Sequence, residues 1–169
     1  MLLRLADQVD VGVRRIGRVF SWLVFAIILL MAVNVILRYS LSLGSVWAQE
    51  LEWHLLVPLI LLVMSWGVQS GDIARIDVYY ADFSPAKKLM VDLLASGLTA
   101  MVCLLVIWFS LGYVEQSFSI MEQSPDPGGI PYRWVIKAFI PLGFFILLLQ
   151  SAASFVRDIH RLRSLGVQP

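Results

Sequence analysis

Four uncharged apolar segments constrain this chain more than any other feature of its sequence. Residues 22–33, 55–68, 93–111 and 138–149 contain no Asp, Glu, Lys, Arg or His. With their apolar flanks, each approaches the roughly 20 residues that a helix needs to cross the hydrocarbon core of a bilayer. Helix is the expected backbone, because lipid cannot satisfy unpaired N–H and C=O groups. The segments therefore predict a protein that crosses a membrane four times.

The predicted spans account for most of the chain. They run over about 20–37, 51–69, 89–113 and 134–156. The composition, 59% hydrophobic and 15% charged, is more apolar than that of a typical soluble domain and leaves little sequence for one. We therefore predict an all-α integral membrane protein, with one four-helix membrane domain over residues 1–169.

The positive charges predict the orientation of these spans. Ten of the thirteen Lys and Arg residues lie before the first span, between the second and third, or after the fourth: Arg4, Arg14, Arg15, Arg18, Arg75, Lys87, Lys88, Arg157, Arg161 and Arg163. Membrane proteins concentrate such residues on the cytoplasmic side. Both termini are therefore expected in the cytoplasm, and the loops 38–50 and 114–132 on the opposite side.

The N-terminal arm, residues 1–19, carries a helical pattern of its own. Its apolar residues recur at steps of three and four, and its Arg and Gln residues occupy the opposite face. This pattern predicts an amphipathic helix in the cytoplasmic interface of the membrane, although a charged leader that frays would give a similar sequence. Candidate interfacial anchors here and at the other span ends are Arg14, Arg15, Trp47, Trp53, Lys87 and Lys88.

Several functional classes are disfavoured by what the chain lacks. Coupled ion pathways usually need charged groups near the bilayer centre, and the span centres carry none. The two histidines, His54 and His160, lie near opposite membrane faces and cannot ligate one haem iron. The lone Cys103 is expected to be a buried thiol, and no metal or phosphate-binding motif is present. The sequence predicts no enzyme activity, cofactor or metal, and the net charge of +1 argues against a nucleic-acid partner.

A polar cluster marks the outer entrance of the second span. Glu50 and His54 share a helix face because they are four residues apart, whereas Glu52 points elsewhere. A solvated helix entrance explains this cluster, but so do contacts with a neighbouring helix or another chain. Arg38, at the outer end of the first span, is the expected partner of Glu50 or Glu52.

The second outer loop, over residues 122–131, is predicted to have a defined shape. It contains three prolines around Gly128 and Gly129, which fix turns and permit close backbone approach. Glu122 is the first residue of the loop, and Lys137 follows the loop on the same side of the membrane. The segment reads either as a tight re-entry turn or as a docking surface for a partner.

Taken in order, these motifs resemble the small membrane subunit of tripartite ATP-independent periplasmic (TRAP) transporters, the DctQ-like family. The resemblance lies in Asn34…Arg38-Tyr39, Trp47-x-x-Glu50-x-Glu52, the inner link Gly71 to Val78, and Glu122-x-Ser124-x-x-Pro127-Gly128-Gly129-Ile130-Pro131 followed by Lys137 and Pro141. One departure is the inner link, where Ile73-Ala74-Arg75 lacks a histidine that the family often has.

The resemblance implies a transporter subunit in the bacterial inner membrane. A large membrane subunit would carry the substrate with sodium, and a periplasmic protein would capture an organic acid-type substrate. The small subunit would enlarge the fixed scaffold beside the large one. Its expected partner contacts are Arg38, Glu50, Glu52, His54, Glu122, Gly128, Gly129 and Lys137. The alternative is a membrane anchor or assembly subunit of a respiratory-type enzyme complex.

Overall fold

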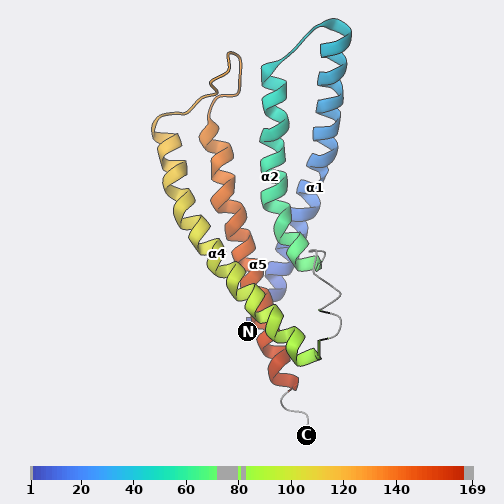
Figure 1. Cartoon of the computed structure of the whole chain (residues 1–169), viewed down its shortest axis with the longest axis vertical. Helices are drawn as coiled ribbons and strands as arrows, with labels where there is room; N and C mark the ends of the chain where they lie inside the picture. The colour runs from blue at the N-terminus through green and yellow to red at the C-terminus, as the bar shows by residue number, and fades with distance from the viewer. Residues whose placement is uncertain (1, 72–79, 81–82, 166–169) are drawn as a thin grey trace.

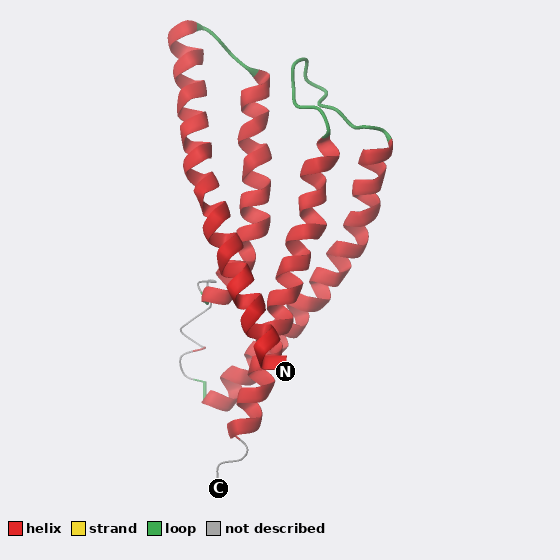
Figure 2. Ribbon diagram, turned by 180° about the vertical axis from the view of Figure 1, so that it is seen from behind, coloured by secondary structure: helices red, strands yellow, loops and turns green. Residues whose placement is uncertain are grey.

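The computed structural model describes residues 2–71, 80 and 83–165, and these residues form four long helices. The helices are α1 (Leu2–Leu41), α2 (Val46–Ser70), α4 (Pro85–Ser119) and α5 (Arg133–Leu165). No strand occurs in the described residues (Figure 2). All four helices are long and apolar enough to cross a membrane, in agreement with the predicted all-α protein of four membrane helices. The limits of the spans within these helices stay a prediction.

The start of α1 and the end of α5 lie toward the same end of the molecule (Figure 1). We call this the terminal end, and we call the end with the 42–45 and 120–132 connections the distal end. A chain that crosses a membrane four times must begin and end on the same side of it. The side of the membrane that this end faces stays a prediction from the positive charges.

Local sequence explains where the helices begin and end. Ser45 caps α2 by accepting a hydrogen bond from the N–H of Ala48 at 3.3 Å, and α2 ends at Gly71, whose φ of +75° suits glycine. Ser84 caps α4 by accepting from the N–H of Lys87 at 3.4 Å, and Pro85 occupies the first turn, as its fixed φ favours. The inner link quoted for the family resemblance, 71–78, lies outside the described residues beyond Gly71.

The N-terminal arm differs from the expectation in one respect. Its residues are helical, but they continue into the first span as one helix, α1, without a break. Ala6, Val13 and Gly17 are buried on this part of α1. An added Cβ on Gly17 would lie 2.7 Å from the ring of Trp66, so α1 and α2 approach closely there. The arm therefore packs on protein, and its place in a membrane interface stays a prediction.

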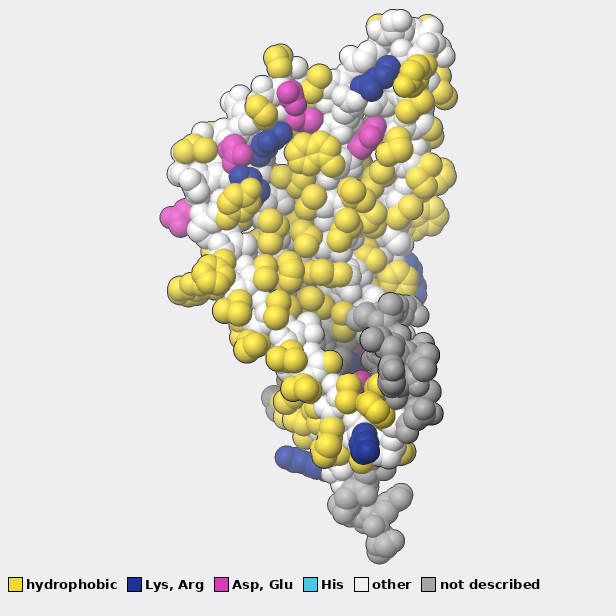
Figure 3. Space-filling view, in the orientation of Figure 1, with side chains coloured by type: hydrophobic (Ala, Val, Ile, Leu, Met, Phe, Trp, Pro, Cys, Tyr) yellow, Lys and Arg dark blue, Asp and Glu magenta, His cyan; other side chains and the backbone are white. Residues whose placement is uncertain are grey.

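Helix α5 is the centre of the packing. It packs against α1, α2 and α4. The stripe of α4 that is buried consists of Cys103, Ser110 and Ser117, at seven-residue spacing, which allows two helices to stay in close contact over several turns. Cys103 is fully buried, as expected for a core thiol. Most remaining apolar side chains are exposed, and Figure 3 shows them covering the middle of the molecule, with charged side chains gathered toward its ends.

Candidate functional site

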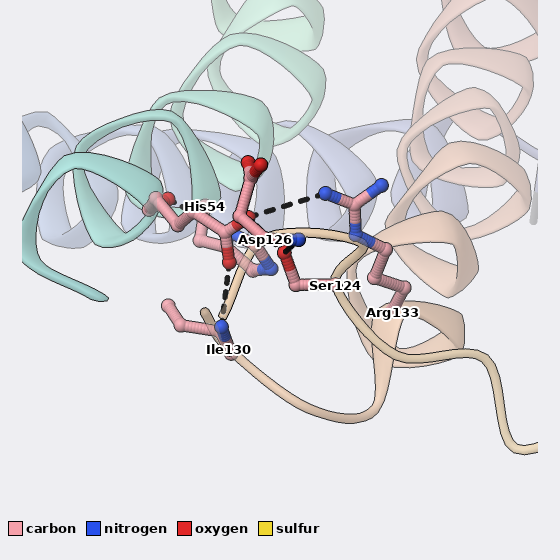
Figure 4. Close-up of polar contacts among 6 residues, drawn as sticks. His54, Ser124, Asp126, Ile130 and Arg133 are labelled. Carbon is pink, nitrogen blue, oxygen red and sulfur yellow. Dashed lines mark hydrogen bonds and ion pairs between the residues drawn. The ribbon is translucent and has the colours of Figure 1, made fainter. Parts of the chain in front are cut away.

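Glu50 is the central residue of the distal end. Its side chain is almost fully buried and accepts three hydrogen bonds, from donors on Ser124, Ile130 and Arg133 that Figure 4 labels. The donors are the hydroxyl of Ser124, the N–H of Ile130 at 2.5 Å and Nη2 of Arg133 at 3.2 Å. Ser124 and Ile130 belong to the 120–132 connection, and Arg133 begins α5. This set of four residues, the Glu50 cluster, therefore fixes the connection and the start of α5 against α2.

The two loop glycines explain how the connection comes this close. An added Cβ on Gly129 would lie 2.3 Å from Oγ of Ser124 and 2.7 Å from Oε2 of Glu50. Gly128 has a φ of +82°, which disfavours other residues. Gly129 therefore makes a close approach to the chain's own helix α2, whereas an added Cβ on Gly128 would meet nothing within 4 Å. A direct contact of either glycine with another protein stays a prediction.

A second ion pair connects the distal ends of α4 and α5. One carboxylate oxygen of Glu122 accepts hydrogen bonds from Nζ of Lys137 and from the hydroxyl of Ser117. The bond from Lys137, followed by the one from Ser117, holds the pKa of the Glu122 carboxyl below its ordinary value. Nζ of Lys137 also lies 4.0 Å from the ring centroid of Tyr113. Glu122 and Lys137 thus serve an internal contact between neighbouring helices.

The expected ion pair between Arg38 and a glutamate is wrong. Glu50 pairs with Arg133, and Glu52 accepts a hydrogen bond from Nδ2 of Asn34 at 3.1 Å. Asn34 is buried on α1, whereas Arg38 lies one turn further along and is exposed. The α1–α2 link at this level is therefore an amide–carboxylate hydrogen bond, because Asn34 faces α2 and Arg38 does not.

His54 and Trp53 lie beside the Glu50 cluster. Nδ1 of His54 is 2.7 Å from the carbonyl oxygen of Glu50, which fits the shared helix face predicted for these residues. The rings of His54 and Trp53 are 4.3 Å apart, and the guanidinium of Arg133 lies 5.4 Å from the Trp53 ring. Trp53, expected only as a membrane anchor, thus also packs against α5.

The other expected anchors lie on the surface or near it. Arg14, Arg15, Trp47 and Lys87 are exposed, and Nζ of Lys88 lies 5.5 Å from the Tyr80 ring. Their depth in a membrane stays a prediction.

A third polar cluster, at the terminal end, was not anticipated from the sequence. Both carboxylate oxygens of Asp10 accept hydrogen bonds from Arg157, and one also accepts from Nε2 of Gln150 at 3.0 Å. Nε2 of Gln69 donates to the carbonyl oxygen of Asp10 at 3.0 Å. This Asp10 cluster ties the N-terminal arm to α2 and α5. Asp10 and Arg157 are 147 positions apart, so no local pattern could pair them.

The polar side chains of the described residues make structural contacts between helices rather than a metal site. No group of three His, Cys, Asp or Glu side chains in the described part of the chain could hold a metal ion. The polar side chains instead form internal ties near the two ends of four apolar helices, with the Glu50 cluster the most complete.

This pattern has a counterpart among known protein families. The family model described as "Tripartite ATP-independent periplasmic transporters, DctQ component" matches residues 27–161, which is most of the chain. The matched range includes the Glu50 cluster, the Glu122–Lys137 ion pair and the hydrogen bond between Asn34 and Glu52. The chain belongs to the DctQ family. It is therefore a multi-pass membrane protein and a small component of a TRAP transporter. A comparison with curated proteins gives no match.

Membership of the DctQ family confirms the resemblance drawn from the motifs. DctQ proteins are transporter components rather than enzymes, and they work together with other TRAP components. The alternative of an anchor for a respiratory-type complex is not favoured by this match.

Proposed function

We propose that this DctQ-family chain forms part of the fixed scaffold on which a large membrane subunit moves an organic acid-type substrate together with sodium. A separate periplasmic protein delivers the substrate. The chain lies in the bacterial inner membrane with its terminal end in the cytoplasm, as its positive charges predict. Its role is mechanical: it widens the scaffold and resists tilting.

The observation that carries this proposal is the Glu50 cluster. It joins α2, from the first helical hairpin, to the 120–132 connection and α5, from the second. Such a tie is expected in a part that must keep its shape, because separating the hairpins would leave a buried carboxylate without donors. The span centres of 22–33, 55–68, 93–111 and 138–149 carry no charge that could move an ion.

The candidate partner contacts divide into two groups. Glu50, Gly129, Glu122 and Lys137 already have partners within the chain, so they shape the distal surface that a partner meets. Arg38 is exposed at the distal end of α1 and is assigned to a direct contact with the large subunit or the periplasmic protein. Three candidates belong to neither group, because each is at least partly accessible at the surface: Glu52, His54 and Gly128.

The test compares Glu50→Gln with Glu115→Gln, a matched change at an exposed residue of α4. The tagged chain is co-expressed with its large membrane subunit and periplasmic protein, and two quantities are measured: recovery of the large subunit in mild detergent and sodium-dependent uptake. The amide keeps the size of the carboxylate but places an NH₂ donor among three donors. We expect both quantities to fall several-fold for Glu50→Gln and neither to change for Glu115→Gln.

Two outcomes would contradict the proposal. Normal recovery and normal uptake with Glu50→Gln would show that the tie between the hairpins has no role in assembly or transport. Recovery of the wild-type chain with a redox enzyme, in place of a large polytopic subunit, would overturn the scaffold role itself. Thermal unfolding of each variant separates a failure to fold from a failure to assemble.

A further inference from the structure

Three arginines without partners form a basic surface on α1, between the Asp10 cluster and the first predicted span. Arg14, Arg15 and Arg18 are exposed, and their side chains make no hydrogen bond or ion pair with another residue in the described part of the chain. By contrast, Arg157 at the same end of the molecule is held by Asp10. We call the three arginines the basic surface. The internal ties of the protein leave it unexplained.

Helical geometry puts the basic surface on one side of α1, near the edge of the membrane. At 100° per residue, Arg14 and Arg15 lie about 40° and 60° to either side of Arg18 around the axis. Arg18 comes just before the span predicted from about residue 20, and Arg14 is six residues, or about 9 Å, from that point. Headgroups occupy about 5–7 Å on each side of the hydrocarbon core, and long arginine side chains can reach this layer.

Exposed apolar side chains continue along the same side of α1 into the span. Trp22, Phe25 and Leu29 are 73%, 64% and 56% exposed. Each lies within about 40° of Arg18 around the helix axis, so the four residues share one side of α1. We call Trp22, Phe25 and Leu29 the apolar strip. A positive group that adjoins such a strip is complementary to a molecule with an anionic head and a long apolar chain.

The acidic residues of α1 do not neutralise the basic surface. This helix contains two, Asp7 and Asp10. Asp10 is bound by Arg157. Asp7 is exposed on the same side as the arginines, but it lies seven residues, or about 10 Å along the axis, from Arg14. The charge of the basic surface is therefore available to an external anion.

We propose that this side of α1 binds an acidic phospholipid of the phosphatidylglycerol type. The guanidinium groups of the basic surface donate hydrogen bonds to the phosphate, which matches their paired N–H groups in shape and charge. An acyl chain lies along the apolar strip. A zwitterionic lipid fits less well, because the arginines repel its positive group. An acidic protein segment would pair with the arginines but would leave the continuous apolar strip without a role.

This inference does not depend on the proposed scaffold role. The basic surface precedes residues 27–161, the part of the chain that matches the DctQ model, so membership of the family assigns it no function. Recovery of the large subunit therefore tests the scaffold role, whereas lipid preference tests the site on α1.

The test measures how strongly brominated lipids quench the fluorescence of Trp22. The full-length chain, with the subunits that copurify with it, is reconstituted into phosphatidylcholine bilayers. A minor fraction of the lipid is either phosphatidylglycerol or phosphatidylcholine with the same brominated acyl chains. The Trp22→Phe variant gives the signal of all other tryptophans, and the difference is assigned to Trp22. We expect phosphatidylglycerol to quench Trp22 at least about twice as strongly as phosphatidylcholine, and high salt to reduce this preference.

Charge variants locate the preference on α1. Arg14→Gln combined with Arg18→Gln is expected to bring the two lipids to equal quenching, whereas Arg14→Lys combined with Arg18→Lys keeps the charge and should keep most of the preference. The matched control combines Lys87→Gln with Arg163→Gln, which removes two exposed charges from α4 and α5 at the same end of the molecule. This control is expected to behave as wild type.

Three results would overturn the proposal. The first is equal quenching of Trp22 by the two lipids in wild type. If the Gln variants of Arg14 and Arg18 then also lose a copurifying subunit, the basic surface binds protein in place of lipid. The second is a preference that survives in those Gln variants. The third is an equal loss of preference in the Lys87 and Arg163 control, which would show a general effect of surface charge rather than a site on α1.

Discussion

The contact between α2 and α5 gives the sharpest test of the packing. At Gly143 on α5, an added Cβ would lie 2.7 Å from both Cβ and the carbonyl oxygen of Leu61, and 3.0 Å from its carbonyl carbon. Carbon atoms in contact normally lie about 3.5–4.0 Å apart. Two of the three close atoms belong to the backbone of α2, so a rotamer change cannot relieve the clash. The substitution Gly143→Ala must therefore push α2 and α5 apart by several tenths of an ångström or more.

The change in stability expected for Gly143→Ala is the sum of two opposing effects. Overpacking of this kind costs about 1–3 kcal/mol, whereas alanine stabilises a helix interior by about 1 kcal/mol relative to glycine. Gly112 on α4 is the matched control, because its added Cβ would meet nothing within 4 Å. Gly112→Ala has the helix gain without the clash, so the two variants should differ by about 1–3 kcal/mol. For a chain of this size, that is a difference in Tm of about 2–12 °C.

The assay is thermal unfolding in detergent, followed by reaction of a thiol dye with Cys103, which is buried against α5 in the folded state. We expect Gly143→Ala to unfold at a lower temperature than Gly112→Ala, with wild type between them or level with Gly143→Ala. If Gly143→Ala is as stable as Gly112→Ala, the backbone approach of α2 to α5 is not as close as described, and the reasoning is refuted.

Two further predictions concern the polar ties. The pKa of Glu122 is lowered in the folded state, so its ionised form stabilises the protein above the ordinary pKa of a glutamate, and this contribution is lost as the pH falls through the lower folded value. Glu122→Gln should therefore lower Tm relative to Glu115→Gln at pH 7, and the difference should shrink as the pH falls through the lowered pKa of Glu122; a difference that is constant with pH would contradict this. Asp10→Asn weakens the tie from the N-terminal arm to Arg157, so trypsin should cleave after the exposed Arg14 and Arg15 several-fold faster than in wild type, whereas Asp7→Asn, at an exposed position, should leave the cleavage rate unchanged.

The sequence predicted the parts of this protein that depend on local pattern. Uncharged apolar runs of sufficient length predict membrane helices directly, because the bilayer leaves no other backbone solution. Ser84 and Pro85 set the start of α4 for an equally local reason, a capping side chain followed by a residue with a fixed φ. The order of motifs from Asn34 to Pro141 predicted the DctQ family, which the family match confirms. The seven-residue spacing of Cys103, Ser110 and Ser117 was also present in the sequence and could have identified the face of α4 that packs.

The partners of the polar residues were decided only by the tertiary structure. Sequence proximity suggested Arg38 for Glu50, but Arg133 from the other hairpin is the residue that pairs with it. The choice depends on the rotation of each helix about its axis, which decides that Asn34 rather than Arg38 faces α2, and on the close approach of the backbone at Gly129. The same holds for Asp10 and Arg157, which meet only because α1 packs along α5. A linear pattern limits which face of a helix is buried, whereas the pairing of side chains far apart in the chain depends on how all four helices pack together.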